Sequence, residues 1–515
     1  MVGSAETQGA EGSPSEIANP WHLPVGWEWT TLGNLGELLR GVSFRKDQVA
    51  DNLLDGYLPL IRGNNIQDGS VASAELVNVK ASCVSSQQIL RFGDIVLTMS
   101  SGSAALIGKS AWIGKKHDGI TFGAFCACFR AAEKYARWIF WFLQTPFYRG
   151  RITNLAKGTN INNLKRGHLE NLPIPMPPLA ERRRIVARID ALFAEIAEGE
   201  AALAAARNGL DTFRRALLKA AVTGELTKDW REANPVGETG QDFLDRIAKD
   251  RARRATGKRS RRIADSQQVD AATLQELPPG WTWASLGELG EIVGGATVDQ
   301  KRRPADPVTV PYLRVANVQR GHVDLSEVKR ITVERTTAQK LQLRRGDVLL
   351  NEGGDRDKIG RGWVWDGSAP DMIHQNHVFR VRLHDGGFNP YFISHYANEL
   401  GRPFFIEKGK QTTNLASISL SKISTLPVPV PPPQEATEIM RRVSEALAAS
   451  ADTLAVLDAE AADAARLKQS ILKAAFEGRL VSQDAADEPA DALLARLVAS
   501  PAVQRARRGR TKRDS

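Results

Sequence analysis

Cysteine is scarce in this sequence. Only Cys83, Cys126 and Cys128 occur among the 515 residues, an odd number without the spacing of a disulfide framework. The scarcity argues against the small secreted proteins that depend on disulfides, and it indicates a reducing compartment, the cytoplasm.

Long hydrophobic runs are missing as well. No stretch approaches the roughly 18 apolar residues that a membrane-spanning helix requires. Residues 1–20 carry neither the basic start nor the apolar centre of a secretory signal, and they are rich in glycine, serine, alanine and glutamate. We therefore predict a disordered N-terminal segment and a cytoplasmic protein that does not enter a membrane.

The chain has little that resembles an active site. The glycine-rich segment Asn351–Arg361 lacks the residue order of a phosphate-binding P-loop. Asn389-Pro390-Tyr391 lacks one proline of the loop that methyltransferases need. His374 and His377 are three residues apart in a segment that we expect to be a strand, so their side chains should lie on opposite faces. We predict no catalytic residues, no cofactor and no metal site.

Basic residues outnumber acidic residues. The sequence has 69 Lys and Arg against 59 Asp and Glu, which gives a net charge of +10. Hydrophobic residues make up 42% and charged residues 25%, as in an ordinary globular protein. The basic excess favours a polyanionic partner such as nucleic acid, although a solvated basic surface has the same composition.

The strongest positive feature is an internal repeat. Six segments of the first half return in the same order in the second half, at offsets between 251 and 254 residues. The matching pairs are Leu23–Gly41 with Leu277–Gly295, Pro59–Ile66 with Pro311–Val318, Arg91–Leu97 with Arg344–Leu350, Lys157–Leu164 with Lys408–Leu415, Leu172–Pro178 with Leu426–Pro432, and Arg214–Leu226 with Lys468–Leu480. A repeat of this length is a whole domain followed by a helix.

This organisation predicts an α+β protein with two mixed α/β domains. Each domain combines short β-branched runs, separated by Gly, Asn and Asp turns, with one helical stretch, and it ends in a proline-rich strap that leads into a long helix. The predicted regions are a disordered N-terminus at 1–20, a first domain at 21–178, a first long helix at 179–224, a basic linker at 225–276, a second domain at 277–432, a second long helix at 433–480 and a basic tail at 481–515.

The two long helices should form a coiled coil. The first has apolar residues seven apart at Ile189, Ile196, Leu203, Leu210 and Leu217, with Ile185, Leu192, Gly199, Ala206 and Phe213 in the second register. The second helix has a seam richer in alanine that includes Leu454 and Leu467. Antiparallel pairing would place the domains at opposite ends and parallel pairing would place them together. A linker of about 50 residues allows both.

Two stretches rich in arginine and lysine follow the long helices. Arg246–Arg262 carries nine basic residues and one acidic residue, and Arg505–Arg513 repeats this arrangement near the C-terminus. Blocks of like charge are usually solvated and disordered, and such arms can still neutralise phosphates.

Polar residues at corresponding places in the two domains are the candidate DNA contacts. The segments KGTNINNL and KGKQTTNL concentrate ammonium, amide and hydroxyl groups, which bind phosphates and base edges. A structural loop with asparagine in turn positions has the same composition, and capping is the alternative for the paired arginines and asparagines after a strand. The predicted DNA-binding residues are Arg62, Asn65, Lys157, Thr159, Asn160, Asn162, Asn163, Arg314, Asn317, Lys358, Arg361, Lys408, Lys410, Gln411, Thr412 and Asn414.

With these motifs the sequence resembles the specificity subunit of type I restriction-modification systems. The resemblance rests on the GW-W-LG openings, the GD-I/V-L strand, the KG-NL segment, the LP-P-PP strap and the LLKAA-G-L helix end, and it covers about Leu23 to Leu497. It implies two target-recognition domains that each read half of a bipartite sequence in double-stranded DNA. It also implies an antiparallel coiled coil that separates them, sets the spacer and docks two DNA-methyltransferase subunits, with restriction and translocase subunits as further partners.

A second class of protein remains possible from the residues alone. A coiled-coil scaffold could space protein partners without touching DNA. Binding to duplex DNA that weakens steeply with salt distinguishes the two, because phosphate neutralisation releases counterions. An enzyme fused to recognition domains would need a third, cofactor-binding region, for which this chain has no room.

Overall fold

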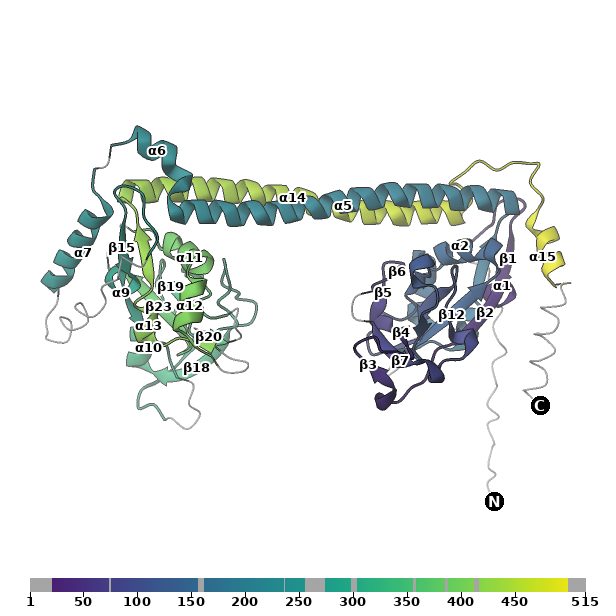
Figure 1. The fold of residues 1–515 in the computed structure, drawn as a ribbon, viewed down its shortest axis with the longest axis horizontal. Coiled ribbons are helices and arrows are strands. Elements are labelled where there is room, and N and C mark those ends of the chain that lie inside the picture. Colours follow the sequence, from purple (N-terminus) through teal and green to yellow (C-terminus); the bar gives the residue numbers. More distant parts are fainter. Residues whose placement is uncertain are drawn as a thin grey trace, which may run out of the picture. The chain divides into compact units, whose positions relative to one another are not determined.

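The computed structural model describes residues 21–73, 76–155, 162–235, 237–254, 274–297, 303–354, 358–384, 388–411 and 416–498. The predicted N-terminal segment 1–20, part of the basic linker and the arm Arg505–Arg513 lie outside these residues. The chain divides into two compact units (Figure 1). The first unit is Met1–Leu203 with Ala459–Ser515, and the second unit is Ala204–Asp458.

The first unit combines short strands with a few helices. Its strands are β1 (Glu28–Thr31), β2 (Gly36–Arg40), β3 (Val49–Ala50), β4 (Tyr57–Ile61), β5 (Ile66–Gln67), β6 (Ser70–Val71), β7 (Val77–Lys80), β8 (Ile95–Thr98), β9 (Ser100–Ser101), β10 (Ser110–Trp112), β11 (Thr121–Phe122), β12 (Cys126–Ala131), β13 (Asn162–Asn163) and β14 (Pro173–Met176). Its helices are α1 (Leu32–Leu35), α2 (Glu133–Phe142), α3 (Pro146–Leu155), α4 (Arg166–Glu170) and α15 (Ala490–Val498), with the first part of α5 (Leu179–Thr223) and the last part of α14 (Pro433–Phe476).

The second unit repeats this plan. Its strands are β15 (Thr282–Ser285), β16 (Gly290–Val293), β17 (Pro307–Leu313), β18 (Lys329–Glu334), β19 (Val348–Asn351), β20 (Gly353–Gly354), β21 (Gly362–Val364), β22 (Ile373–His374), β23 (Val378–Leu383), β24 (Lys410–Gln411), β25 (Ala416–Ser417) and β26 (Pro427–Val430). Its helices are α6 (Lys228–Ala233), α7 (Gly240–Arg254), α9 (Leu286–Leu289), α10 (Arg335–Leu341), α11 (Pro390–Glu399), α12 (Arg402–Lys408) and α13 (Leu420–Ile423), with the remaining parts of α5 and α14.

Each unit is built on a four-stranded sheet of the same order. The order is β10-β8-β12-β2 in the first unit and β21-β19-β23-β16 in the second, and the neighbouring strands are antiparallel. A second sheet follows in each unit, β11-β4-β7-β3 and β22-β17-β18. The predicted α+β class with two repeated mixed domains is confirmed.

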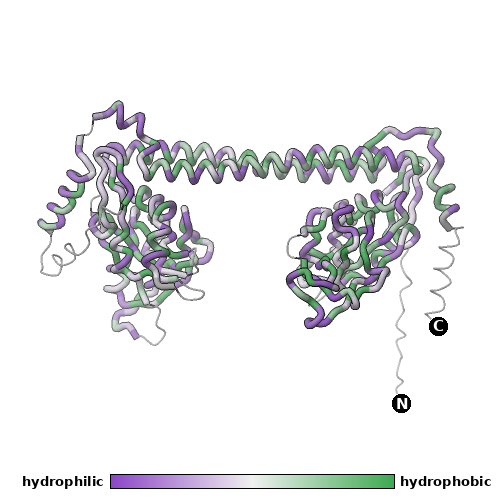
Figure 2. Tube along the Cα trace, viewed as in Figure 1, coloured by the Kyte–Doolittle hydropathy of each residue, from purple (hydrophilic) through white to green (hydrophobic). Residues whose placement is uncertain are grey.

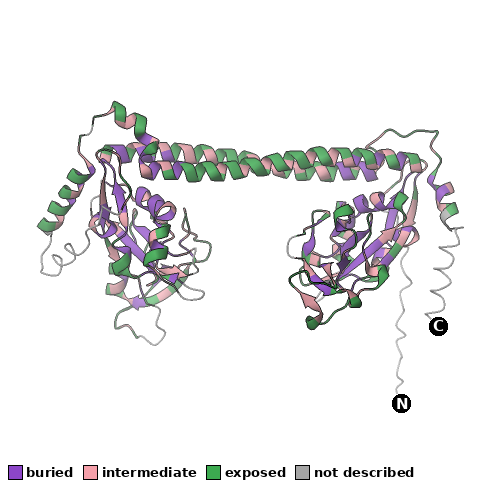
Figure 3. Ribbon diagram, viewed as in Figure 1, coloured by how far each residue is buried: buried purple, intermediate pink, exposed green. Residues whose placement is uncertain are grey.

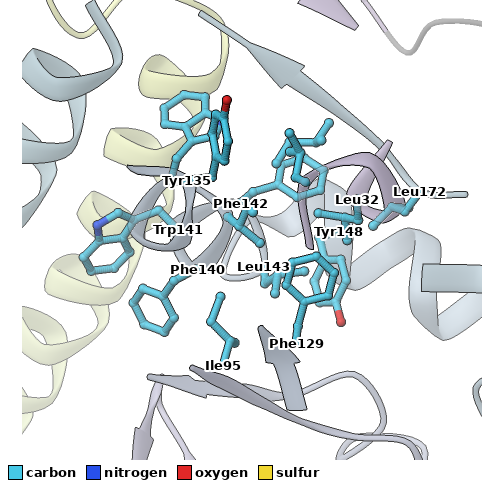
Figure 4. Packing of buried hydrophobic residues seen from close by; sticks show 14 of the residues in the cluster. Leu32, Ile95, Phe129, Tyr135, Phe140, Trp141, Phe142, Leu143, Tyr148 and Leu172 are labelled. Carbon is cyan, nitrogen blue, oxygen red and sulfur yellow. The ribbon is translucent and has the colours of Figure 1, made fainter. Parts of the chain in front are cut away.

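The core of the first unit forms where α2 covers the four-stranded sheet. The strand residues Ile95 and Phe129 are buried, and they belong to one apolar cluster with Tyr135 and Phe142 of α2. Figure 4 shows these side chains packed together from the sheet and the helix. Burial of aromatic side chains of this size removes much apolar surface from water and makes a large contribution to the stability of the fold.

The proline-rich straps are extended, as the sequence predicted, and each one pairs with the opening strand of its own domain. β14 runs antiparallel to β1, with Pro175 opposite Trp29. β26 runs antiparallel to β15 in the same way, with Pro429 opposite Trp283. Each strap therefore brings the end of its domain back to the beginning, at the point where the long helix starts.

The long helices α5 and α14 pair antiparallel within each unit. In the first unit the Lys468 ammonium lies 2.7 Å from the Glu200 carboxylate. In the second unit the Arg207 guanidinium pairs with Asp458 and also donates to the carbonyl of Leu457 at 3.4 Å. Figure 2 shows hydrophobic and hydrophilic residues alternating along both helices. The orientation that the residues alone left open is antiparallel.

The predicted seam of the coiled coil is correct for the register from Ile189 to Leu217. It is wrong for part of the register from Ile185 to Phe213. Phe213, Leu454 and Leu467 are 47%, 43% and 52% exposed, so these side chains face away from the seam. An α-helix drifts by about 20° per heptad relative to a strict seven-residue repeat, which amounts to about 80° between Ile185 and Phe213. In Figure 3 the buried residues of both helices concentrate near the domains, where they join the apolar core of each unit.

Short helices close each unit. α7 packs Phe243 and Ile247 into the core of the second unit, and the backbone N–H of Gly240 donates to the carbonyl of Gly280 at 2.8 Å. α15 does the same in the first unit, where the N–H of Ala490 donates to the carbonyl of Gly26 at 2.9 Å. Part of the region predicted as a basic linker is thus helical. None of the helices that the structure describes combines the length and hydrophobicity that crossing a lipid bilayer demands.

Candidate nucleic-acid interface

In the first unit, several loops meet where β8 ends. The backbone N–H of Met99 donates to the carbonyl of Phe125 at 2.8 Å, and the N–H of Leu164 donates to the carbonyl of Met99 at 2.8 Å. β9 pairs antiparallel with β13, and the N–H of Gly123 donates to the carbonyl of Ile61 at 2.9 Å. We call the described parts of residues 62–65, 99–103, 123–125 and 162–164 the first loop edge.

The second unit repeats this convergence where β19 ends. The N–H of Glu352 donates to the carbonyl of His377 at 2.9 Å, and the N–H of Ile418 donates to the carbonyl of Glu352 at 2.9 Å. β20 pairs with β25, which also pairs with β24. The N–H of Gln375 donates to a carbonyl at the end of β17, that of Leu313. We call the described parts of residues 314–317, 351–361, 375–377 and 408–418 the second loop edge.

These bonds correct the alignment of the KG-NL segments. The sequence paired Leu164 with Leu415, but the strand pairing places Leu164 opposite the same backbone position as Ile418. The structural counterpart of Asn163 is therefore Ser417, three residues after Asn414. The Asn-Leu match in the two sequences is a local likeness, because strand pairing and not residue identity fixes the register.

The two buried asparagines of the predicted set act as caps. The Asn65 side chain is 2% exposed, and its amide oxygen accepts the backbone N–H of Arg62 at 2.9 Å. Asn317 is 3% exposed, accepts the N–H of Arg314 at 3.0 Å and donates to the carbonyl of Glu327 at 3.0 Å. Burial and these backbone bonds favour the capping alternative for both residues.

The arginines beside these caps lie on the two loop edges. Arg62 is exposed. The Arg314 guanidinium donates to the carbonyl of Glu327 at 3.1 Å and lies 3.4 Å from its carboxylate. A DNA-binding role for either arginine remains a prediction.

Part of the remaining predicted set lies at the two loop edges. Asn163 is exposed, and its amide oxygen accepts the Ser100 hydroxyl at 2.8 Å. Lys408 ends α12 and lies 2.8 Å from Glu407. Lys358 and Arg361 flank the turn before β21 and are half-buried. The backbone of Asn162, Lys410 and Gln411 lies in β13 and β24, and Lys157, Thr159, Asn160, Thr412 and Asn414 lie outside the described residues.

In each unit, a glycine contacts an aromatic side chain in the turn before the outer strand of the four-stranded sheet. We call these two glycines the anchoring glycines. Gly108 has φ +69° and its carbonyl accepts the Tyr148 hydroxyl at 2.9 Å. Gly360 has φ +68°, and a Cβ there would lie 2.0 Å from the Phe405 ring. Only glycine combines this backbone conformation with this close approach. The same device therefore holds the turn before β10 and the turn before β21.

The Gly-Asp strand motif lies at the opposite end of the same strands and is structural. Asp94 accepts the Arg91 N–H at 2.8 Å and pairs with Arg130 at 2.6 Å. Asp347 pairs with Arg382 at 2.7 Å in the second unit. The hydrogen bond to Asp94 raises the pKa of the Arg130 guanidinium above its ordinary value.

In the described part of the chain, the absence of a metal site and of catalytic residues remains a prediction. No group of three or more His, Cys, Asp or Glu side chains there could hold a metal ion. His374 is buried and its Nδ1 lies 2.6 Å from the carbonyl of Val378, whereas the His377 side chain is 55% exposed. Burial lowers the pKa of His374 to about 4, so this ring is neutral at physiological pH.

The sequence prediction missed the turn before β12 and before β23. Phe125 and His377 occupy the same backbone position there, because their carbonyls accept the corresponding N–H groups of Met99 and Glu352. Extending the repeat alignment through the segments TFGAFC and IHQNHV, with no shared residue at this position, would have identified them.

Comparison with known proteins agrees with the repeat. A family model described as the type I restriction modification DNA specificity domain matches residues 24–204 and again residues 278–453. The chain is 30% identical over 471 residues to the type I restriction enzyme EcoKI specificity subunit of Escherichia coli strain K12, which covers 91% of this chain and 92% of that protein. It is 31% identical over 498 residues to the StySPI specificity subunit of Salmonella potsdam, with 94% and 97% covered.

A solved structure shares the fold. One chain from a structure of the type I R-M system superposes with a TM-score of 0.59, at 19% identity, and covers 90% of this chain and 100% of that chain. At this level of identity the likeness concerns the arrangement of helices and sheets alone.

Proposed function

This chain belongs to the family of type I restriction-modification specificity subunits, and on that premise we propose that it reads a bipartite target in double-stranded DNA. Each domain reads one half-site through its loop edge. The observation that carries the proposal is that the two loop edges share one backbone frame and differ in side chains. Ser100 and Asn163 occupy the positions that Gly353 and Ser417 occupy in the second unit. Two half-sites of different sequence require this combination, because base edges are distinguished by the donors and acceptors that meet them.

The long helices and the partner subunits complete this function. The antiparallel pair α5 and α14 fixes the spacer between the half-sites and offers a docking surface to two DNA-methyltransferase subunits. Restriction and translocase subunits join the assembly by binding to the methyltransferase subunits. The relatives named above are specificity subunits of type I restriction enzymes, which supports this set of partners. The complex acts on DNA in the cytoplasm.

The chain itself contributes recognition and no chemistry. Purified chain with a methyl donor and duplex DNA should transfer no methyl groups, and activity should require a modification subunit. Methyl transfer by rigorously purified chain alone would contradict this division of labour.

Exchange of one domain tests the proposed function directly. Residues Leu23–Leu172 are replaced by the corresponding segment of another family member, and the methylated motif is read from DNA modified by the complex. One half-site should change while the other half-site is kept. A change in both half-sites would show that the domains do not read independently.

A gel-shift titration separates a DNA reader from a protein scaffold. Binding of the full chain to a duplex that carries the motif should weaken steeply as salt rises, since a slope of about −0.9 in log K against log salt is expected for each phosphate neutralised. A chain that recruits the modification subunits but gives no salt-dependent shift of DNA is a scaffold.

A further inference from the structure

One apolar side chain stands out on the first loop edge. Phe125 is 72% exposed, more than Phe44, Phe92 or Phe213. Its carbonyl is held by two hydrogen bonds, because it accepts the N–H groups of Met99 at 2.8 Å and Ser100 at 3.2 Å. The next residue, Cys126, is 1% exposed and begins β12. The exposure of the Phe125 ring is therefore a property of an ordered turn between two strands.

The residues beside Phe125 in the turn and in β9 are small, and a Cβ at Gly123 would lie 3.7 Å from the Phe44 ring. Gly123 precedes it in the turn, and Ser100 and Ser101 form β9 beside it. Asn163 accepts the Ser100 hydroxyl at 2.8 Å across the β9 and β13 pair. An exposed ring among short hydroxyl and amide side chains can reach a surface that approaches the first loop edge.

The second unit places a different ring at the same backbone position. The His377 carbonyl accepts the N–H of Glu352 at 2.9 Å, as the Phe125 carbonyl accepts that of Met99. The His377 side chain is 55% exposed, and its Nδ1 lies 2.6 Å from the Glu352 carboxylate. The two domains thus present an apolar ring and a hydrogen-bonding ring at equivalent points. A residue that varies in chemistry on a fixed frame is suited to reading different bases.

We propose that Phe125 contacts the 5-methyl group of a thymine in the half-site read by the first domain. The proposal rests on the proposed function and names one specificity-determining residue within it. A phenylalanine ring has no donor or acceptor for a base edge, and the thymine methyl is the apolar group that a base pair presents in the major groove. His377 takes this position at the other half-site and meets a polar base edge.

Replacement of thymine by uracil removes only the 5-methyl group and therefore tests this one contact. The full chain with its modification subunit is titrated with duplexes in which each thymine of the first half-site is replaced in turn by deoxyuridine, at one fixed salt concentration. Removal of the contacted methyl should weaken binding about fourfold, the value for one buried methylene-sized group. With Phe125→Ala that position should lose its preference for thymine, while the remaining positions keep their response.

Phe92 provides the matched control. It is 54% exposed in the same unit, but it lies in the turn before β8, at the opposite end of that strand from Met99. Phe92→Ala should show the same uracil response as the unchanged chain. Discrimination at the remaining positions of the first half-site by Phe125→Ala reports that the first domain of the variant is folded.

Each other outcome overturns the proposal. Equal affinity of the unchanged chain for thymine and uracil at every position excludes a methyl contact. Weaker binding of Phe125→Ala by the same factor on all duplexes indicates a ring inserted between base steps. Lower methylation with unchanged DNA affinity places Phe125 against a protein partner. If the unchanged chain binds no bipartite DNA at all, the proposed function itself fails, and that result is distinct from these three.

Discussion

The indole nitrogen of Trp281 donates to the buried carboxylate of Glu435 at 2.9 Å. Trp27 makes the same bond to Glu181 at 3.0 Å, and both pairs are 154 residues apart in the chain. Each bond joins the opening of a domain to the first turn of the long helix that leaves it. The environments differ, because Glu435 also pairs with Arg231 and accepts the Thr227 hydroxyl, whereas burial raises the pKa of Glu181.

Glutamine substitution should therefore lower the free energy of unfolding at Glu435 and should not lower it at Glu181. Glu435→Gln leaves the Arg231 guanidinium, which is 14% exposed, without its anionic partner. We expect the free energy of unfolding to fall by about 3 kcal/mol, as when one member of a buried pair is removed. Glu181→Gln removes a buried charge and should leave stability at neutral pH unchanged or higher. Denaturant unfolding of both variants measures the difference.

The Glu181 site should also respond to pH. A raised pKa means that the folded chain holds the proton more tightly than the unfolded chain, so the unchanged chain loses stability relative to Glu181→Gln as pH rises above the ordinary value of 4.5. Below that value both side chains are neutral and the two proteins should be alike. A difference that shrinks with rising pH would contradict the assigned direction.

The repeat made much of the fold predictable, and tertiary contacts made the rest unpredictable. Matching motifs gave the two domains, the straps and the long helices, because each is a local pattern. The bond from Trp27 to Glu181 could not be predicted, since no local pattern links residues 154 apart. The same reason explains why Asn163 was aligned with Asn414 and not with Ser417. Pairing to β9 and β20 fixes that register.

The candidate site was predictable only in outline. Sequence preferred DNA contact over capping for Asn65 and Asn317, whereas burial and backbone bonds favour caps. DNA binding by the other candidate residues remains a prediction. Phe125 escaped notice because an apolar residue next to a strand is normally expected to be buried. Its exposure of 72% depends on the turn that the Met99 N–H stabilises.

Replacement of an anchoring glycine should lower the stability of the domain that contains it. Gly360→Ala would place a Cβ 2.0 Å from the Phe405 ring at φ +68°, and we expect a loss of about 2–4 kcal/mol from strain and overpacking together. Gly56 has φ +77° with no atom within 4 Å, so Gly56→Ala should cost only about 1 kcal/mol. Thermal unfolding measures both. Equal losses would show that the ring contact is unimportant.

Lys408 should contact phosphate if the second loop edge binds DNA. Lys408→Ala should weaken binding by a similar factor on every target sequence and reduce the salt slope by about 0.9, the contribution of one phosphate contact. Lys228 in α6 is an exposed lysine of the same unit away from the loop edge, and Lys228→Ala should leave the slope unchanged. A change in sequence preference with an unchanged slope would instead assign Lys408 to a base.

The last prediction concerns the two long helices. If they fix the length of the spacer between the half-sites, lengthening both helices must lengthen the spacer. The two units divide α5 after Leu203 and α14 after Asp458. Insertion of four residues at both points lengthens the antiparallel pair together by about 6 Å and adds close to one helical turn. At about 3.4 Å per base pair, the preferred spacer should grow by one or two base pairs. Both half-site sequences should be unchanged, as read from methylated DNA. An insertion of four residues in α5 alone is the control, since it shifts the Arg207 and Asp458 pairing and should disturb folding. A folded and active double insertion that keeps the original spacer would show that α5 and α14 do not set the distance.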